Sequence, residues 1–588
     1  MRNFITSTLA TLVALTIFSI GSIIISIGFV GALAGLSQTK PVVPTSAILT
    51  VDLSKTILAE QTRQTDLLKM LEGNTQMTTI GIYDAINAIN IAASDPSISC
   101  IYMKPDMVIG GMAQIEELRT ALVNFRMSGK AVVSYIENPT NGGFYLATAS
   151  DKIYMADYDG CTNMFNGASS QMVFLKELLD NLGINVQLIR HGKYKSAGEM
   201  FINTSPSKEN LEQNKAMIES IWQTWSGTIA DARELRSEDL NQMIDNLVLN
   251  TPEDFLTNGL VDGLVTRDEM LTKLGYLGGR PGDLSHISLS DYALARKPLQ
   301  DDSTKPKIAV VYLEGEMVDG NGLEQVAGDR FAGILSEIRK DENVKAVVLR
   351  VNSPGGSVLA AEKILAEIKL IQQDLPVIAS FGDYAASGGY WISAGCDKIF
   401  SNATTLTGSI GVFSMIPDLS KTLDNKLHVN IVSVNSNKHS DMYSKMRPLD
   451  SAERQFMQKS VENIYDRFTT IVSEGRGLSK HAVDAIGQGR VWTGREAVGI
   501  GLADEIGTLE DAIESAISAT DYGMEEVVIA SYPKPLNTWE TLMVQLEGTD
   551  NNILASTPFK NVGEAFAGWT SAQAGKAYAR MPYEFIIK

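Results

Sequence analysis

Ser387 lies in a run of small residues that is typical of an exposed, reactive serine. The run Ala385–Gly389 reads AASGG, and its A-x-S-x-G spacing differs by one methyl group from the G-x-S-x-G turn that presents nucleophilic serines. A second run, Asn352–Ser357 (NSPGGS), follows an apolar stretch of strand type. Its glycines, Gly355 and Gly356, would leave backbone N–H groups free to bind a negative oxygen at a helix start. Together the two runs indicate a serine nucleophile with an oxyanion hole; close helix packing and a plain strand-to-helix turn are the structural alternatives.

A serine nucleophile needs a base to take its proton, and the sequence offers two kinds of candidate. Three histidines follow Ser387 in the second half of the chain, none of them in a recognisable motif: His428, His439 and His481. A lysine can serve instead when burial lowers the pKa of its ammonium group, and Lys195 lies in the sequence GKYKSAGE. Most lysines in such a sequence are at the surface, so the residues alone leave the base open.

The positions around Ser387 belong to the second of two copies of one unit. Thr140–Leu146 (TNGGFYL) matches Ala386–Ile392 (ASGGYWI) at a spacing of 246 positions (386 − 140), and each is followed by D-K-I and an aromatic residue. A repeat of this length indicates a duplicated domain, because solenoid repeats are about 20–50 residues long. Ser387 corresponds to Asn141, which cannot form an acyl ester, and the first copy has no Ser-Pro-Gly sequence. The nucleophile is therefore expected in the second copy only.

Short β-branched runs alternate with helical patterns in each copy, as in βαβ units. In the second copy the pattern predicts, in order, a strand, a helix, a strand, a helix and a strand, at Lys307–Leu313, Gln325–Lys340, Lys345–Val351, Gly356–Ile371 and Val377–Ser380. Right-handed crossovers of this kind give largely parallel sheets. The predicted fold class is α/β, built from two tandem domains.

The composition of the chain places the boundaries of these domains. A Gly/Pro-rich stretch around 278–306 separates an N-terminal repeat, 45–277, from a C-terminal repeat, 307–532. Residues 533–588 have no counterpart in the first repeat and are expected to form a C-terminal extension.

The N-terminal end of the chain predicts a membrane anchor. No residue from Phe4 to Leu36 is charged, and about 20 apolar residues are enough to span a bilayer. A cleaved signal peptide is the alternative, since Ala32–Ala34 reads A-L-A, but its apolar core would usually be about 7–15 residues long. Arg2 precedes the run, so residues 1–3 are expected in the cytoplasm and the rest of the chain outside the inner (plasma) membrane, as a single-pass protein.

The composition disfavours several other classes of function. With 50 basic and 69 acidic residues the formal net charge is −19, which would repel a nucleic-acid backbone. The three cysteines form no C-x-x-C pair, the five histidines form no H-E-x-x-H, and there is no phosphate-binding glycine loop. We therefore expect no nucleic-acid partner, no metal and no cofactor.

Several co-linear motifs together resemble the signal peptide peptidase A (protease IV) family in its long form, which consists of bacterial membrane-anchored serine proteases. The resemblance runs from the anchor to about residue 530, and its motifs are Asn352–Ser357, Ala385–Trp391, Leu406–Gly411, Tyr194–Ala197 and Gln488–Gly494. It implies a fold related to the crotonases and to the proteolytic subunit of Clp protease. It also implies degradation of cleaved signal peptides and other hydrophobic peptides at the membrane, in a homotetramer.

The resemblance also implies roles for individual residues. Ser387 matches the nucleophile and Lys195 the general base, so that a Ser–Lys dyad would be shared between the two repeats. Gly356 and Gly388 match the positions of the oxyanion hole, and Ser409 matches a hydroxyl that helps to hold the lysine. Lys438 and the adjacent His439 remain alternative candidates for the general base, because Lys438 lies near the position in the second repeat that corresponds to Lys195. The family often has a bulkier residue than Gly198 at that place.

Two other functions remain as alternatives at this point. A crotonase-like acyl-CoA hydratase or isomerase would share the fold, but such an enzyme normally needs carboxylates at the oxyanion site, and none flanks Gly355 and Gly356. A non-catalytic scaffold that binds peptides is the other alternative.

Overall fold

The structure is a computed structural model that describes Phe18, Gly21 and residues 40–62, 77–158, 160–279, 285–297, 304–323, 325–534 and 576–581. Apart from Phe18 and Gly21, the predicted anchor at 4–36 lies outside the described residues. Among the helices in these ranges, none combines the length and the hydrophobicity that a membrane span requires.

The first repeat is built on a parallel sheet whose strand order is β9-β1-β4-β5-β6-β8. Its strands are β9 (His286–Ser288), β1 (Ala47–Asp52), β4 (Ile98–Lys104), β5 (Ala131–Ile136), β6 (Lys152–Ala156) and β8 (Gly263–Val265). The helices packed on it include α3 (Ile82–Ser94), α4 (Met112–Arg126), α5 (Asn141–Ala147), α11 (Arg267–Leu277) and α12 (Leu289–Arg296). Long apolar runs such as β1 and β4 are buried on both faces, as parallel strands between helices usually are.

The second repeat has the same strand order, β21-β10-β13-β15-β16-β20, again with parallel neighbours. Its strands are β21 (Val528–Tyr532), β10 (Lys307–Glu314), β13 (Val344–Ser353), β15 (Val377–Ala386), β16 (Lys398–Ser401) and β20 (Glu505–Ile506), with β17 (Leu406–Gly408) and β19 (Val491–Thr493) added beside β15. The main helices are α13 (Gly328–Lys340), α14 (Val358–Ile371), α15 (Gly388–Ser393), α16 (Ser451–Arg476) and α19 (Leu509–Ser518). The identical order shows that the duplication inferred from the sequence is a duplication of the fold.

Two boundaries differ from the sequence prediction. The stretch predicted as a linker contains β9, which extends the first sheet, and α12, which packs against α3. Its buried side chains, Ile287, Leu289 and Tyr292, are too few to give a readable period. The predicted helix Gly356–Ile371 begins only at Val358, since Gly355–Ser357 form a short strand, β14. Gly356 has a φ of 152°, which an α-helix does not accommodate. Gly355 and Gly356 therefore belong to a strand rather than to a helix start.

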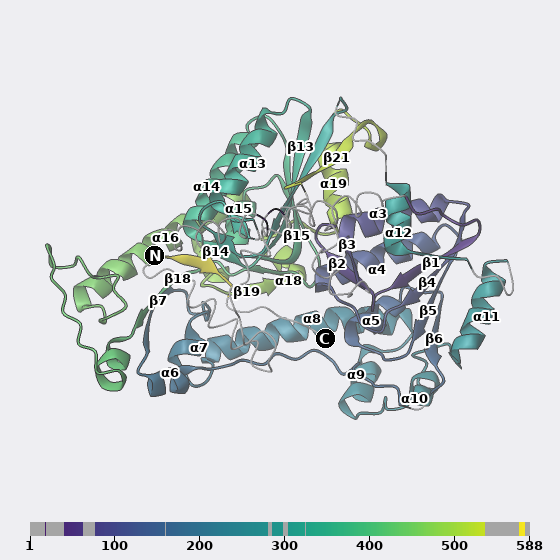
Figure 1. Cartoon of the computed structure of the whole chain (residues 1–588), viewed down its shortest axis with the longest axis horizontal. Helices are drawn as coiled ribbons and strands as arrows, with labels where there is room; N and C mark the ends of the chain where they lie inside the picture. Colours follow the sequence, from purple (N-terminus) through teal and green to yellow (C-terminus); the bar gives the residue numbers. More distant parts are fainter. Residues whose placement is uncertain are drawn as a thin grey trace, which may run out of the picture.

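A third sheet joins the two repeats. Its order is β12-β11-β14-β22-β18-β7, and only β7 (Asn185–His191) comes from the first repeat. The other strands are β12 (Val326–Ala327), β11 (Met317–Val318), β14, β22 (Tyr578–Arg580) and β18 (Val412–Asp418). β7 pairs antiparallel with β18 over its full length of 7 residues. At the left of Figure 1 the two lie on the same side as β14, from which β22 separates them. This pairing carries the chain that follows β7 into the second repeat.

A buried ion network also connects the repeats. Arg350 on β13 is fully buried and donates from Nε to Glu60 Oε2 at 2.7 Å and from Nη1 to Glu117 Oε1 at 2.7 Å, both carboxylates lying in the first repeat. In the other direction, Asp383 on β15 accepts from the backbone N–H of Ala113 at 2.8 Å, at the start of α4. Burial, with Glu60 nearby, raises the pKa of Asp383 to about 7. The repeats are therefore fixed to each other by charges that a single repeat would leave unpaired.

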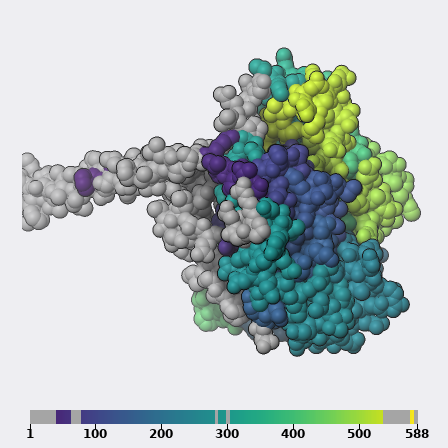
Figure 2. Space-filling view, turned by 90° about the vertical axis from the view of Figure 1, so that its right-hand side faces the viewer, coloured from purple at the N-terminus to yellow at the C-terminus, as the bar shows by residue number. Residues whose placement is uncertain are grey.

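The two repeats also contact each other through α3 and α19. Figure 2 shows the end of the second repeat, coloured yellow, seated directly on the first repeat, coloured blue. There Asn90 on α3 donates to Glu510 on α19 at 2.7 Å. The two repeats are thus in contact here as well as through the third sheet and the buried ion network.

Candidate active site

Ser387 occupies a strained turn between a strand and a helix. β15 ends at Ala386 and α15 begins at Gly388, so that Ser387 alone makes the turn, with φ 55° and ψ −109°. A side chain rarely adopts such a backbone conformation, and residues that do so cluster at functional sites. The turn is held by the backbone N–H of Ser387, which donates to the Gly408 carbonyl at 2.8 Å. The small residues on which the sequence prediction rested thus lie in a tight strand-to-helix turn.

Lys195 reaches the second repeat from the turn that follows β7. Its side chain is fully buried, and the adjacent Tyr194 N–H donates to the Gln488 carbonyl at 2.9 Å. Two glycines of the second repeat make room for it. A Cβ on Gly489 would lie 2.6 Å from Lys195 Cβ, and one on Gly411 would lie 3.1 Å from Lys195 Cδ. The long side chain therefore passes through a channel that larger residues would close.

The Lys195 amine ends between two serines. Nζ lies 2.9 Å from Ser387 Oγ, across 192 residues of sequence, 2.9 Å from Ser409 Oγ and 3.0 Å from the Ser409 carbonyl oxygen. Burial alone lowers the pKa of this amine well below its ordinary value, because the low-dielectric surroundings disfavour the charged form. The two donors of a neutral amine fit the two Ser409 oxygens, which leaves the lone pair of Nζ for the Ser387 hydroxyl.

Ser409 lies just beyond β17, and the structure explains how it is aimed. Its φ is 51°, and its N–H donates to the Arg490 carbonyl at 2.7 Å. Both of its oxygens consequently face Lys195. Of the residues that the resemblance singled out, Ser387, Lys195 and Ser409 are therefore brought into direct contact.

The two glycines proposed for the oxyanion hole lie on either side of the same turn. Gly388 follows Ser387 as the first residue of α15. Gly356 lies in β14, opposite Met317 on one side. Its neighbour Gly355 is packed against the turn, since a Cβ on Gly355 would lie 2.5 Å from the Gly388 backbone nitrogen. The Gly388 N–H thus lies at the turn itself, whereas Gly356 is paired with Met317 of β11 and with Ala579 of β22.

The rival bases are not brought to Ser387. Lys438 is exposed, and His439 Nδ1 lies 2.9 Å from Glu453 Oε1. His439, Asp450 and Glu453 are close enough together to suggest metal ligands, but Arg447 already donates to both oxygens of Glu453 at 2.7 and 2.8 Å. This guanidinium lowers the pKa of Glu453 to about 2. The cluster is an ion-pair network on the outside of the protein.

Sequence reasoning missed two residues that hold the lysine backbone. Arg190 Nη1 donates to the Lys195 carbonyl at 2.8 Å and to Glu199 Oε1 at 3.0 Å. Glu199 is fully buried, and a charged residue within the GKYKSAGE sequence could have drawn attention to it. The structure also explains why this chain has glycine at position 198, where the family often has a bulkier residue. A Cβ there would lie 2.5 Å from Leu188 Cδ1. Leu188 fills the space that a bulkier residue would take.

The corresponding place in the first repeat has a structural role. Asn141 Nδ2 donates to the Gly167 carbonyl at 3.1 Å, and Asn141 Oδ1 accepts from the Gly167 N–H at 3.1 Å. The amide therefore fastens a loop where the second repeat has its reactive serine.

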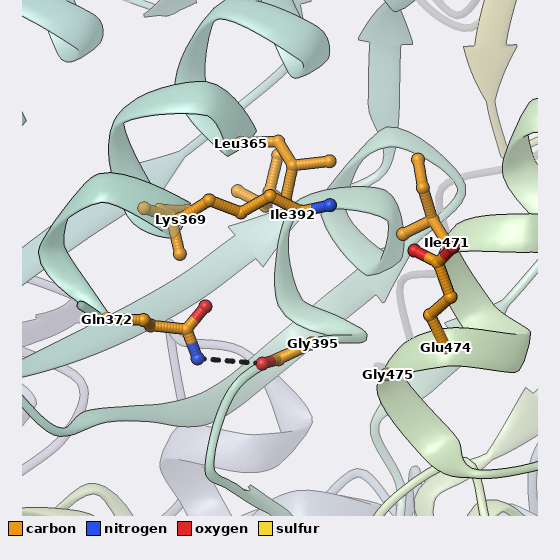
Figure 3. A pocket seen from close by; sticks show the side chains of 9 residues that line it. Leu365, Lys369, Gln372, Ile392, Gly395, Ile471, Glu474 and Gly475 are labelled. Atoms are coloured by element: carbon orange, nitrogen blue, oxygen red, sulfur yellow. Dashed lines mark hydrogen bonds between the residues drawn. The ribbon is translucent and has the colours of Figure 1, made fainter.

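A small pocket lies between α14, α15 and α16, and Figure 3 shows the side chains that line it. Leu365, Lys369 and Gln372 of α14, Ile392 of α15 and Glu474 of α16 are among its lining residues, and Gln372 Nε2 donates to the Gly395 carbonyl at 2.8 Å. None of the residues that contact Ser387 Oγ lines it. This pocket is separate from the site described above.

Comparison with known proteins shows the family to which the chain belongs. The model of "Peptidase family S49" matches twice, over residues 124–278 and 369–522, once in each repeat. The chain belongs to peptidase family S49. It is similar to "Protease 4" of Haemophilus influenzae, with 35% identity over 78% of this chain and 76% of that protein, and to "Protease 4" of Salmonella typhi, with 35% identity over 74% and 71%. A "Putative signal peptide peptidase SppA" of Enterococcus faecium is 36% identical over 40% of this chain and 69% of its own length.

Membership of family S49 decides between the alternatives left open by the sequence. The protein is a serine peptidase, not an acyl-CoA hydratase or a passive scaffold. The shorter relative matches 238 residues, about the size of one repeat, as expected if the longer chain arose by duplication.

Proposed function

We propose that this S49 peptidase is an endopeptidase that works through a Ser–Lys dyad, with Ser387 as nucleophile and Lys195 as general base. The observation that carries the proposal is the 2.9 Å contact between Lys195 Nζ and Ser387 Oγ in a fully buried site. The neutral amine takes the hydroxyl proton while Oγ attacks the peptide carbonyl. Backbone N–H groups at Gly356 and Gly388 stabilise the resulting oxyanion. Lys195 then gives its proton to the leaving amine, and water hydrolyses the acyl-enzyme.

Ser409 positions the base in this mechanism. Its two oxygens fix Nζ from the side opposite the nucleophile, so the lone pair stays directed at Ser387. Arg190 acts one step further away, by holding the Lys195 carbonyl. Both are positioning residues, since neither would touch the substrate.

We propose cleaved signal peptides and other hydrophobic peptides as the substrates. The Enterococcus faecium relative has signal peptide peptidase in its name. β14 and β18 lie beside the dyad in the third sheet, with β22 between them. Strands whose edges are free bind extended peptides through backbone hydrogen bonds, and a substrate could pair with β14 or β18 in the place of β22. A released signal peptide has few side-chain charges, and it can adopt an extended form once it leaves the bilayer.

The test of this function uses the detergent-solubilised full chain with a fluorophosphonate probe and a synthetic signal peptide. We expect the probe to label one serine per chain, and both labelling and peptide cleavage to disappear in Ser387→Ala. Cleavage that persists in a folded Ser387→Ala protein would overturn the proposal. Cleavage of casein but not of the signal peptide would leave the dyad standing and reject the substrate class.

Activity should fall as the pH is lowered. Lys195 must be neutral to act as a base, and burial lowers its pKa well below the ordinary value, so the active form predominates above that lowered pKa and is lost as the pH falls through it. We expect log(kcat/KM) to decline with a slope approaching 1 on the acid side. Circular dichroism at each pH checks that the fold is intact. A rate that stays constant or rises on acidification in the folded protein would exclude a lysine base.

We propose that the uncharged segment Phe4–Leu36 anchors the protein in the inner membrane, with both repeats outside the cytoplasm. The length of the segment and the preceding Arg2 support this arrangement. A chain that lacks residues 1–39 should remain in the supernatant after alkaline extraction, whereas the full chain should stay with the membrane. Protection of the full chain from external protease in spheroplasts would contradict the orientation.

We also propose a homotetramer, and the repeat itself supports an interface between copies. In the first repeat Ile184-Asn185-Val186 leads into β7, which pairs with β18 of the second repeat. The matching Val429-Asn430-Ile431 of the second repeat is exposed and lies in no strand. Apolar side chains continue along it, with Val432 84% and Val434 95% exposed. A second copy could pair with this segment as β18 pairs with β7.

Charges placed on this segment should therefore dissociate the assembly. We expect the double variant Val432→Asp, Val434→Asp to have a lower mass than the wild type by light scattering in detergent. The control is Leu247→Asp, which changes another exposed apolar residue (80% exposed) and should leave the mass unchanged. A double variant with the wild-type mass would remove this segment from the interface.

A further inference from the structure

The edge that we assign to substrates is already occupied by the chain itself. β22, near the C-terminus, lies between β14 and β18 in the third sheet. It pairs antiparallel with β14, with Gly355 opposite Arg580, Gly356 opposite Ala579 and Ser357 opposite Tyr578. On its other side Tyr578 pairs with Phe413 of β18. The predicted extension after residue 532 therefore contains a strand that completes the sheet beside Ser387.

The backbone of this strand passes directly over the reactive turn. A Cβ on Gly355 would lie 2.0 Å from the Ala579 carbonyl oxygen and 2.5 Å from the Gly388 backbone nitrogen. A Cβ on Gly388 would lie 3.2 Å from the same carbonyl oxygen. The Ala579 carbonyl thus lies beside the N–H of the residue after the nucleophile, where a scissile carbonyl would have to lie.

Contacts at both ends hold the strand in place. At the start, Lys576 forms an ion pair with Asp319, and its carbonyl accepts from Ser414 Oγ at 2.9 Å. At the other end, the Met581 N–H donates to the Pro354 carbonyl at 2.7 Å. Ala579 and Met581 are buried. A segment bound by backbone pairing, by a salt bridge and by two buried side chains is seated in a built site.

We infer that residues 576–581 occupy the substrate groove of their own chain and inhibit the peptidase until a substrate or another event displaces them. The inference rests on the proposed function of this site. A strand edge can pair with one partner at a time, so the segment and a substrate exclude each other. Because the segment is tethered to the same chain, it competes at an effective concentration in the millimolar range that a free peptide seldom reaches.

The segment also indicates which peptides fit the groove. Side chains alternate along a strand, and Ala579, whose carbonyl lies at the turn, is completely buried. Because the Ala579 side chain is completely buried, a larger one would have to displace the residues packed around it. Peptides with a small residue before the cleaved bond are therefore the class that the groove accepts.

The test compares the full chain, with its intact mass verified, with a chain truncated after Gly575. Fluorophosphonate labelling of Ser387 and peptide hydrolysis should both be at least tenfold faster in the truncated chain. A peptide with the sequence of residues 576–581 should then inhibit the truncated chain competitively. In the full chain, Ala579→Glu should behave like the truncation, because a carboxylate cannot be buried there, and Ala579→Gly, which keeps the backbone pairing, should stay inhibited.

Equal labelling rates in the full and truncated chains would overturn the inference. Hydrogen exchange keeps this result separate from failure of the proposed function. If neither chain reacts with the probe, the peptidase mechanism fails. Hydrogen exchange would still show whether the segment occupies the groove. If it does, the Gly355 and Gly356 amides should exchange faster after truncation, and unchanged exchange would show that it does not.

Discussion

Replacing Lys195 by methionine should abolish peptide hydrolysis and at the same time make the protein more stable. The base is lost, and with it we expect a decrease in kcat/KM of at least about 10³-fold, comparable with the loss in Ser387→Ala, because the two residues act as a unit. Methionine has a similar length and leaves no amine to be kept neutral in a buried channel. We expect about 1–2 kcal/mol of added stability, as for other strained active-site residues.

The sign of the stability change follows from the lysine pKa. Burial lowers the pKa of Lys195 in the folded state, so the unfolded chain binds the extra proton more readily and stability falls as the pH drops below the unfolded value. The methionine variant lacks this dependence. Its advantage over the wild type in urea unfolding should therefore be large near neutral pH and should shrink as the pH approaches about 10.4, the ordinary lysine pKa.

The controls for this prediction are the rival bases. Lys438→Ala and His439→Ala should retain wild-type kcat/KM, because Lys438 is exposed and His439 is paired with Glu453. If Lys195→Met still cleaves the peptide while one of these two variants does not, the base lies within the second repeat. If Lys195→Met is inactive but less stable, the amine has a structural role that the dyad does not describe.

Removing Arg350 should separate the repeats or unfold them. The fully buried guanidinium pairs with Glu60 and Glu117, so Arg350→Leu leaves two buried carboxylates without a counter-charge. Breaking a buried pair in this way costs about 3–5 kcal/mol, which corresponds to a decrease in the unfolding midpoint on the order of 10 °C. Activity should disappear with it, because Lys195 and Ser387 come from different repeats.

An uncharged version of the Arg350 network tests whether unpaired buried charge causes this loss of stability. The triple variant Glu60→Gln, Glu117→Gln, Arg350→Met should recover most of the lost stability, since uncharged replacements of buried pairs are often tolerated. The control is Arg236→Leu, whose partner Asp239 is at the surface and whose loss should leave the unfolding midpoint almost unchanged. An Arg350→Leu protein as stable as the control would show that the network does not hold the repeats together.

Much of the architecture was predictable because its signals are local. The AASGG run at Ser387 needs only adjacent small residues to make the turn, and the duplication is visible because corresponding motifs keep their order and spacing. The alternation of apolar runs and helical patterns predicts parallel sheets, since a parallel crossover requires a helix between strands. The strand order is then the same in both copies.

Contacts between distant parts of the chain could not be read in the same way. The residues alone left Lys195 and three histidines as possible bases, and only the resemblance favoured Lys195, with Lys438 and His439 as its rivals. Its contact with Ser387 depends on the pairing of β7 with β18, and periodicity does not say which strands pair across a repeat boundary. Gly489 and Gly411 likewise matter only because Lys195 passes between them.

The turn at Ser387, the duplicated α/β fold and the asymmetry between Ser387 and Asn141 could be inferred from the chain alone, because each depends on residues that are close together or regularly spaced. Which amine faces Ser387, and the position of β22 between β14 and β18, became visible only in the folded molecule. Backbone pairing is almost independent of side-chain type, so the sequence of a strand does not name its partner. A segment such as Tyr578–Arg580 can complete any free strand edge of matching shape, and the fold alone determines which edge is within reach.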